Sequence, residues 1–211
     1  MHSDTDSEGT RELTRSLAKT LNTDAVGNVL RNAAVKEHTD NVCLSVVPIR
    51  LFAGDRSVVT YAFLDPGSTT CFITKQLYDE LRPSRSLVSN TQMDLKTLSG
   101  ADSMESLVVK GLVATDINCR HSLTLPEVYT LSELPADRSD TPSPKELAKW
   151  PHLRNIDIPR IEGCDVGILI GQHAPDAIKP CEVVDGGSED VPFAVRTRLG
   201  WIIQGLRCPT Q

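Results

Sequence analysis

The sequence has 211 residues and a formal net charge of −6, with 22 basic and 28 acidic side chains and no block of lysine or arginine, so we expect no nucleic-acid partner. Its length suffices for one domain with a sizeable core, and no apolar run is long enough to span a membrane. The six cysteines form no Cys-x-x-Cys pair, and the polar N-terminus lacks the apolar stretch of a signal peptide. We therefore expect a reduced, intracellular protein, most simply a cytoplasmic one.

Residues 1–40 are polar and contain no aromatic residue, and they are predicted to form a helical or disordered leader outside the core. Residues 41–207 are predicted to form one domain, with a tail at 208–211. Within the domain, short apolar and β-branched segments alternate with turn-forming residues, which is typical of a β-sandwich or β-barrel. The expected strands cover residues 42–51, 57–64, 93–98, 106–113, 113–121, 122–131, 166–170 and 199–205.

Short helices are expected at three places between these strands. Thr74 can cap a helix that Pro83 ends, because proline cannot continue the hydrogen-bond ladder. Residues 132–162 are rich in proline and charge, and they are predicted to be a surface insertion with a short helix around 145–150. One helical turn is expected at residues 174–178.

The most informative feature is Asp65, which follows an apolar strand and precedes Pro66 and Gly67. An aspartate at the end of a buried strand presents a carboxylate for acid-base chemistry. The same three residues are also an ordinary β-turn signal, with proline and glycine at the corners. In that alternative, residues 61–64 pair directly with 71–73 across a two-residue turn.

Taken in order, the strands, the Asp-x-Gly-Ser segment and the glycine-ended strand near the C-terminus resemble a retropepsin protomer. The closest resemblance is to the aspartic peptidases of BEL/Pao-type retrotransposons, and it spans roughly residues 42–205. It rests on Leu64-Asp65-Pro66-Gly67-Ser68, Trp150-Pro151-His152-Leu153, Ile168-Leu169-Ile170-Gly171-Gln172 and Arg196-Thr197-Arg198-Leu199-Gly200-Trp201. The resemblance implies a mostly β, retropepsin-like closed β-barrel, the acid-protease fold, with one or two short helices.

The resemblance further implies an aspartic endopeptidase that acts as a homodimer, with one catalytic Asp65 from each chain. Two carboxyl groups about 3 Å apart share one proton, so one can activate water while the other protonates the scissile carbonyl. No metal or cofactor is needed. The implied substrate is an extended polypeptide, namely the retrotransposon's own polyprotein.

Three positions are expected to support Asp65. Gly67 would allow the sharp turn that aims the carboxylate. Ser68 would donate a hydrogen bond to Asp65, although a turn serine that bonds its own backbone is the alternative. Gly171, which follows the strand that ends at Ile170, would pack under the loop where a side chain cannot fit.

The hairpin tip at residues 99–103 resembles the flap that covers a bound peptide and excludes water. The candidate flap residues are Ser99, Gly100, Ala101 and Asp102. The alternative for this segment is an exposed hairpin turn without a binding role.

Two further segments carry an Asp-x-Gly pattern. Asp185 is followed by two glycines and a serine, but the charged and proline-broken sequence after it predicts a loop. Asp165 precedes an apolar strand instead of ending one. We therefore expect one catalytic aspartate per chain and a site built by two chains, with residues 199–205 as the candidate intersubunit strand.

Pro66 departs from the family pattern, which has threonine or serine at this position. Proline has neither the hydroxyl nor the amide that ties the two catalytic loops together, and the loss of such buried bonds costs about 1 to 3 kcal/mol per chain. The alternative function is therefore a catalytically inactive, retropepsin-shaped binding module or a decayed transposon copy.

Two pairs, each made of one cysteine and one histidine, are candidate metal ligands. Cys119 lies near His121, and Cys164 lies near His173. Neither pair has a second, correctly spaced pair of ligands, so no metal site is expected.

Overall fold

The computed structural model describes residues 42–97, 100–188 and 191–207. The expected leader and tail lie outside the described residues. The strands are β1 (Val42–Cys43), β2 (Val46–Ala53), β3 (Arg56–Leu64), β4 (Cys71–Thr74), β5 (Val88–Thr97), β6 (Gly100–Val109), β7 (Leu112–Asp116), β8 (Ser122–Thr124), β9 (Val128–Leu131), β10 (Val166–Ile170), β11 (Glu182–Val184), β12 (Phe193–Arg196) and β13 (Trp201–Leu206). The helices are α3 (Lys75–Leu81), α4 (Pro144–Leu147) and α5 (Pro175–Ile178), with 3-10 turns at Arg85–Leu87, Arg138–Asp140 and Pro151–Leu153.

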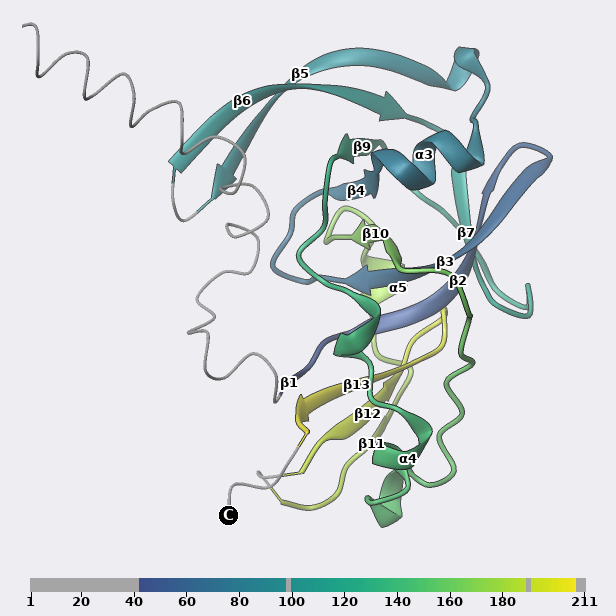
Figure 1. Ribbon diagram of the computed structural model, residues 1–211, viewed down its shortest axis with the longest axis vertical. Coiled ribbons are helices and arrows are strands. Elements are labelled where there is room, and N and C mark those ends of the chain that lie inside the picture. Colours follow the sequence, from purple (N-terminus) through teal and green to yellow (C-terminus); the bar gives the residue numbers. More distant parts are fainter. Residues whose placement is uncertain (1–41, 98–99, 189–190, 208–211) are drawn as a thin grey trace, which may run out of the picture.

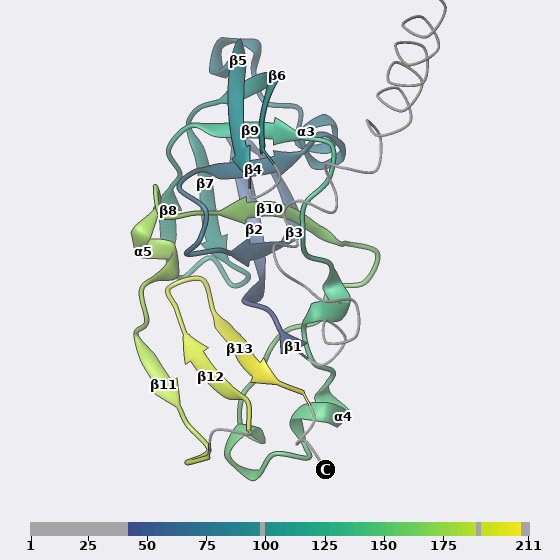
Figure 2. The same cartoon turned by 90° about the vertical axis from the view of Figure 1, so that its left-hand side faces the viewer.

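The strands form two sheets (Figures 1 and 2). The larger sheet has the order β5-β6-β9-β4-β10-β3-β2-β7-β8, and the smaller one has the order β1-β13-β12-β11. Figure 2 shows the smaller sheet below the larger one. The expectation of a mostly β protein with a few short helices is confirmed.

The expected closed barrel is not observed, because neither sheet closes on itself within the described residues. The larger sheet ends at β5 on one side and at β8 on the other. Among the described strands, β5 pairs with β6 alone and β8 with β7 alone. The three-residue β8 offers few backbone groups, and the β5–β6 hairpin leaves the main body of the sheet (Figure 1). The two ends therefore stay separate.

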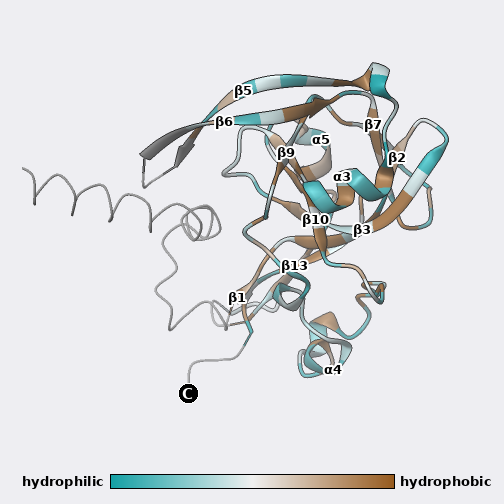
Figure 3. Ribbon diagram, turned by 45° about the horizontal axis from the view of Figure 1, so that its top comes forward, coloured by the Kyte–Doolittle hydropathy of each residue, from teal (hydrophilic) through white to brown (hydrophobic). Residues whose placement is uncertain are grey.

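The main core lies against one face of the larger sheet and is made of aliphatic side chains from β2, β3, β4, β7 and β10. Figure 3 shows hydrophobic residues along these strands and hydrophilic residues on the outer turns of α3. Helix α3 begins where Thr74 accepts a hydrogen bond from the Leu77 amide at 3.2 Å, and it buries Leu77 and Leu81. A Cβ added to Gly167 of β10 would lie 2.5 Å from Leu77, so this glycine lets the helix pack closely on the strand.

Both faces of the smaller sheet are covered by the same chain. Val195 and Ile202 pack into the main core, whereas Ala194 and Ile203 pack against a second cluster on the opposite face. That second cluster contains buried apolar side chains from residues 132–162, the segment expected to be a surface insertion. The segment therefore contributes to the protein interior through Leu147, Leu153 and Ile158.

The candidate intersubunit strand is an inner strand of this sheet. Strand β13 pairs with β12 at Trp201–Gln204 and with β1 at Gly205 and Leu206. Beyond β1, the Leu44 amide donates to the Asp140 carbonyl at 3.2 Å. Among the described strands, residues 201–204 have a neighbour on the β12 side only, so the intersubunit strand at residues 199–205 stays a prediction.

The β5–β6 hairpin is longer and has a shorter tip than expected. Gly100 and Ala101 are paired with β5 as part of β6, opposite Thr97 and Lys96, and Asp102 is paired opposite Leu95. Three of the four candidate flap residues therefore lie in a strand, since the alternating polar sequence continues the ladder nearly to the turn. The fourth, Ser99, lies outside the described residues.

None of the helices in the described ranges has both the length and the apolar character needed to cross a membrane.

Candidate active site

The Asp65 loop connects two strands that are not paired with each other. Strand β10 lies between β3 and β4, parallel to β3 and antiparallel to β4. The alternative of a plain two-residue hairpin, with residues 61–64 paired to 71–73, is therefore wrong. Asp65 instead stands where a buried strand ends beside the end of a second, parallel strand, a position at which polar side chains can converge.

The loop after β3 is a β-turn whose amides bind Asp65. The Ser68 amide donates to the Asp65 carbonyl at 3.2 Å, and the Gly67 amide donates to Asp65 Oδ1 at 2.8 Å. Pro66 occupies the first corner and is exposed. Gly67 is not among the glycines with a positive φ, so the turn does not require its conformational freedom.

Space is what Gly67 provides. A Cβ at this position would lie 3.1 Å from Asp65 Oδ1, a tight contact for a carboxylate that already bonds the Gly67 amide. The expectation that Gly67 is needed for a sharp turn is thus replaced by a packing reason. Because Gly67 has no side chain, the Asp65 carboxylate can lie against the main chain of its own loop.

Ser68 does not orient Asp65 in the single chain. Its hydroxyl donates to the Thr70 carbonyl at 2.9 Å, and the Thr70 amide lies 3.3 Å from the same oxygen. This is the turn serine of the alternative interpretation, and the expected bond from its side chain to Asp65 is wrong. The physical reason is local, because Thr70 lies two residues away and offers both an acceptor and a donor.

Gly171 packs directly under the loop. A Cβ added there would lie 2.3 Å from the Thr70 carbonyl oxygen and 2.6 Å from that of Ser68, closer than any side chain can approach. On either side of this contact the Asp65 amide donates to the Ile170 carbonyl at 3.0 Å, and the Gln172 amide donates to the Ser68 carbonyl at 2.8 Å. These two bonds fix the loop to the end of β10.

The interior beneath the loop contains a buried thiol. Cys71, the first residue of β4, is fully buried, and burial raises the pKa of its thiol against the opposing effect of a backbone hydrogen bond from Gly171. The thiol therefore stays protonated at neutral pH and acts as a small apolar side chain.

An apolar row, buried at its centre and partly buried at its ends, lies beside Asp65 on the sheet. Phe63 of β3, Leu169 of β10, Phe72 of β4 and Tyr129 of β9 are cross-strand neighbours. They belong to a cluster that also includes Met93, Leu95 and Met104 of the β5–β6 hairpin. Because strand side chains alternate between faces, Asp65 continues this row two residues after Phe63.

Sequence reasoning missed this row, although the signal was present. Phe63 lies two residues before the aspartate and Phe72 seven residues after it, each within an apolar segment, but the pattern alone does not indicate that the two share a face of the sheet. The aromatic rings of Phe72 and Tyr129 are tilted at 54° with centroids 6.4 Å apart. The row thus presents an aromatic surface to whatever lies between the sheet and the hairpin.

The two other Asp-x-Gly segments are built differently. Asp185 follows the short edge strand β11, which is exposed at Glu182 and Val183, and accepts a bond from the Gly187 amide at 3.0 Å. Asp165 Oδ1 accepts bonds from the amides of Arg138 and Val166, each at 2.8 Å. Asp165 is exposed, but its carboxylate ties residues 132–162 to the start of β10 and precedes a strand instead of ending one.

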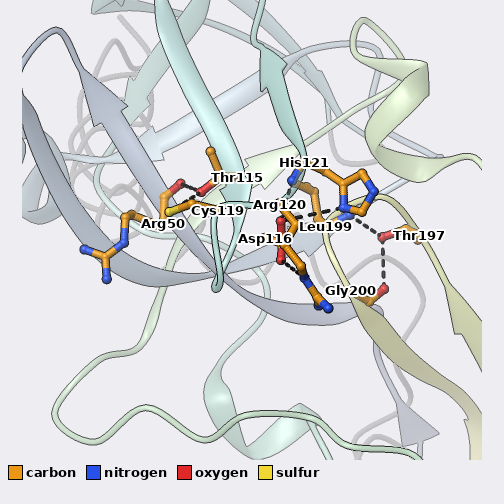
Figure 4. Close-up of polar contacts among 9 residues, drawn as sticks. All are labelled: Arg50, Thr115, Asp116, Cys119, Arg120, His121, Thr197, Leu199 and Gly200. Atoms are coloured by element: carbon orange, nitrogen blue, oxygen red, sulfur yellow. Dashed lines mark hydrogen bonds and ion pairs between the residues drawn. The ribbon is translucent and has the colours of Figure 1, made fainter.

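Figure 4 shows the surroundings of the first cysteine and histidine pair. The buried Asp116 accepts bonds from the His121 amide at 2.7 Å and from Arg120 Nε at 3.2 Å, while Cys119 lies 3.7 Å from the Thr115 hydroxyl. Burial pushes the pKa of Asp116 upward, but these bonds outweigh it and hold the pKa below its ordinary value. The network closes the β7–β8 turn.

Among the described residues, no group of three or more histidine, cysteine, aspartate or glutamate side chains is arranged to hold a metal ion. Comparison with models of known protein families finds no match, and comparison with curated proteins finds none either.

Proposed function

We propose that this chain is an aspartic endopeptidase that acts as a homodimer, with Asp65 of each chain in one shared site. The observation that carries the proposal is the placement of Asp65 where β3 ends beside the parallel β10, on a loop seated over Gly171. A carboxylate held there by main-chain bonds is preorganised and yet open to solvent.

The proposed mechanism needs two such loops. Two Asp65 carboxyl groups about 3 Å apart cannot both ionise at low cost, so the pair holds one proton and titrates as a unit. The ionised member takes a proton from a water molecule while the protonated member donates to the scissile carbonyl. The Gly67 amide donates to Oδ1 at 2.8 Å and fixes the direction of the carboxylate.

The substrate in this proposal is an extended polypeptide. The partly buried Phe63 and Tyr129 lie on either side of the buried Phe72, and their cluster packs against the β5–β6 hairpin. An extended peptide laid along this row would place alternate side chains against aromatic rings. We therefore propose apolar residues next to the cleaved bond, and a retrotransposon polyprotein as the natural substrate.

A second function, binding without cleavage, is favoured by one specific observation. Pro66 lacks an amide hydrogen and a hydroxyl, and Ser68 already bonds Thr70 in its own loop. Neither residue then offers a donor to a second loop, and a dimer held only by its remaining contacts would be weak. A retropepsin-shaped binding module would have the same loop and no turnover.

Peptide hydrolysis by three proteins separates the two functions. The wild type, Asp65→Asn and Pro66→Ser are compared on a peptide library at micromolar and nanomolar protein. Endopeptidase activity predicts a bell-shaped, acid-leaning pH profile for the wild type, loss of activity with dilution, and at least a 10²-fold loss in Asp65→Asn. A wild type as slow as Asp65→Asn, with activity gained in Pro66→Ser, would establish the binding module instead.

A further inference from the structure

We infer that the Asp65–Pro66 peptide bond is a site of spontaneous, acid-promoted chain scission, by which the chain cuts the loop that carries its candidate catalytic carboxylate. This inference concerns the covalent chemistry of one chain. It does not depend on the proposed peptidase activity or on a dimer.

The first support is chemical. Asp65 is the one aspartate in the 211-residue sequence that is followed by proline. An aspartate side chain can reach its own main-chain carbonyl carbon and close a five-membered ring. The leaving group is then the proline nitrogen, which accepts a proton more readily than an ordinary secondary amide because it carries an additional alkyl substituent. The combination makes this peptide bond the weakest in the chain toward acid.

The second support is the geometry of the loop. The Gly67 amide holds Oδ1 at 2.8 Å, and the hydrogen-bonded ring that this contact closes contains the Asp65–Pro66 peptide itself. The bond therefore holds the carboxyl group over the peptide that it would attack and limits its rotation. Oδ2 has no hydrogen-bond partner within the described residues.

The third support is access to water and protons. Pro66 and Gly67 are exposed and Asp65 is half-buried, so acid reaches the proline nitrogen without unfolding the protein. Of the carboxylates considered above, Asp116 differs in this respect because it is buried, whereas Asp165 is exposed. Asp116 and Asp165 are each held by two or more donors, and neither precedes a proline.

The reaction balances as a hydrolysis. An Asp65 carboxyl oxygen bonds to the Asp65 carbonyl carbon, the carbon–nitrogen bond to Pro66 breaks, and the departing nitrogen takes one proton from solvent. One water molecule then opens the cyclic anhydride to two carboxylic acids. The products are residues 1–65 with a C-terminal aspartate and residues 66–211 with an N-terminal proline, and no oxidant or cofactor takes part.

Scission would remove the site without unfolding the sheets. Residues on both sides of the cut remain in strands β3 and β4, and each of these strands pairs with β10. The released Asp65 carries two carboxylates at a free chain end, which is no longer held in the turn. Acid conditions would thus shorten the time for which the Asp65 loop stays intact.

The test is intact-mass analysis of the full chain held at about pH 4, near the ordinary pKa of aspartate, and at neutral pH. The expected result is two fragments whose masses sum to the intact chain plus one water, formed at acid pH with a rate constant that does not change with protein concentration. The folded chain is expected to react about tenfold faster than the same chain unfolded in concentrated urea, a difference of about 1.4 kcal/mol in activation free energy.

Two variants separate this chemistry from enzymatic self-cleavage. Pro66→Ser keeps the carboxylate but replaces the leaving group, and it is expected to react at least tenfold more slowly. Isotope-labelled Asp65→Asn chain, mixed with wild type, serves as bait and is expected to stay intact at this position. Absence of fragments, equal rates in Pro66→Ser, cleavage of the bait, or a folded chain no faster than the unfolded one would each overturn the inference.

Discussion

Replacement of Gly171 by alanine tests how the candidate loop is held in place. The new Cβ would lie 2.3 Å from the Thr70 carbonyl oxygen and 2.6 Å from that of Ser68, and both are backbone atoms that cannot rotate away. The loop and the end of β10 must therefore separate. We expect this to break the Asp65–Ile170 and Gln172–Ser68 backbone bonds, now 3.0 and 2.8 Å long.

The magnitude follows from these two effects. Overpacking of a tight contact costs about 1 to 3 kcal/mol, and each lost backbone hydrogen bond adds about 1 kcal/mol. The expected loss is therefore about 3 to 5 kcal/mol in the free energy of unfolding, a large fraction of the stability of a typical domain. It is read from the midpoint and slope of urea unfolding followed by circular dichroism.

Gly54→Ala is the matched control. Nothing lies within 4 Å of a Cβ at Gly54, but its φ of +63° makes alanine unfavourable by about 1 kcal/mol. The Gly171 variant must lose clearly more than this control. If both variants lose the same free energy, the close contact under the loop does not constrain the protein and the reasoning about Gly171 is wrong.

Three further expectations concern the rest of the molecule. Because one chain covers both faces of the smaller sheet, the diluted chain at nanomolar concentration should still unfold in one cooperative transition; loss of that transition on dilution would mean that folding needs a partner. The pKa of Asp116 is lower in the folded protein than its ordinary 3.8, so its stabilisation is complete above about pH 4 and is lost as the pH falls through the lowered value. Asp116→Asn should therefore cost about 1 to 3 kcal/mol at pH 7 and flatten the acid limb of stability against pH; an unchanged acid limb would contradict this assignment. Tyr61→Phe leaves the Ile161 amide without its 2.8 Å acceptor and should cost about 1 to 2 kcal/mol by urea unfolding, whereas no measurable loss would mean that water replaces the hydroxyl.

Local chemistry was enough to predict several strands and the turn at Asp65, but not strands β11 and β12. Alternating apolar residues give β2 and β3, and Thr74 followed by Leu77 and Leu81 gives the capped helix α3. These features depend on residues that are close together in the sequence, so the local pattern of side chains is enough to predict them. The glycine after Ile170 was likewise recognised from its place at the end of an apolar strand.

Contacts between residues that are far apart in the sequence determined the strand order, the buried segments and the geometry of the loop. Strand β10 lies between β3 and β4 although about a hundred residues separate β3 from β10, and the smaller sheet takes β13 as an inner strand. The sequence of residues 132–162 predicts a surface insertion, yet Leu147 and Leu153 of this segment are buried. The bond from Ser68 to Thr70, instead of to Asp65, is also set by the final loop geometry. An apolar pattern specifies that a face is buried but not which strand covers it, because pairing energy depends on the register and neighbours that only the complete fold supplies.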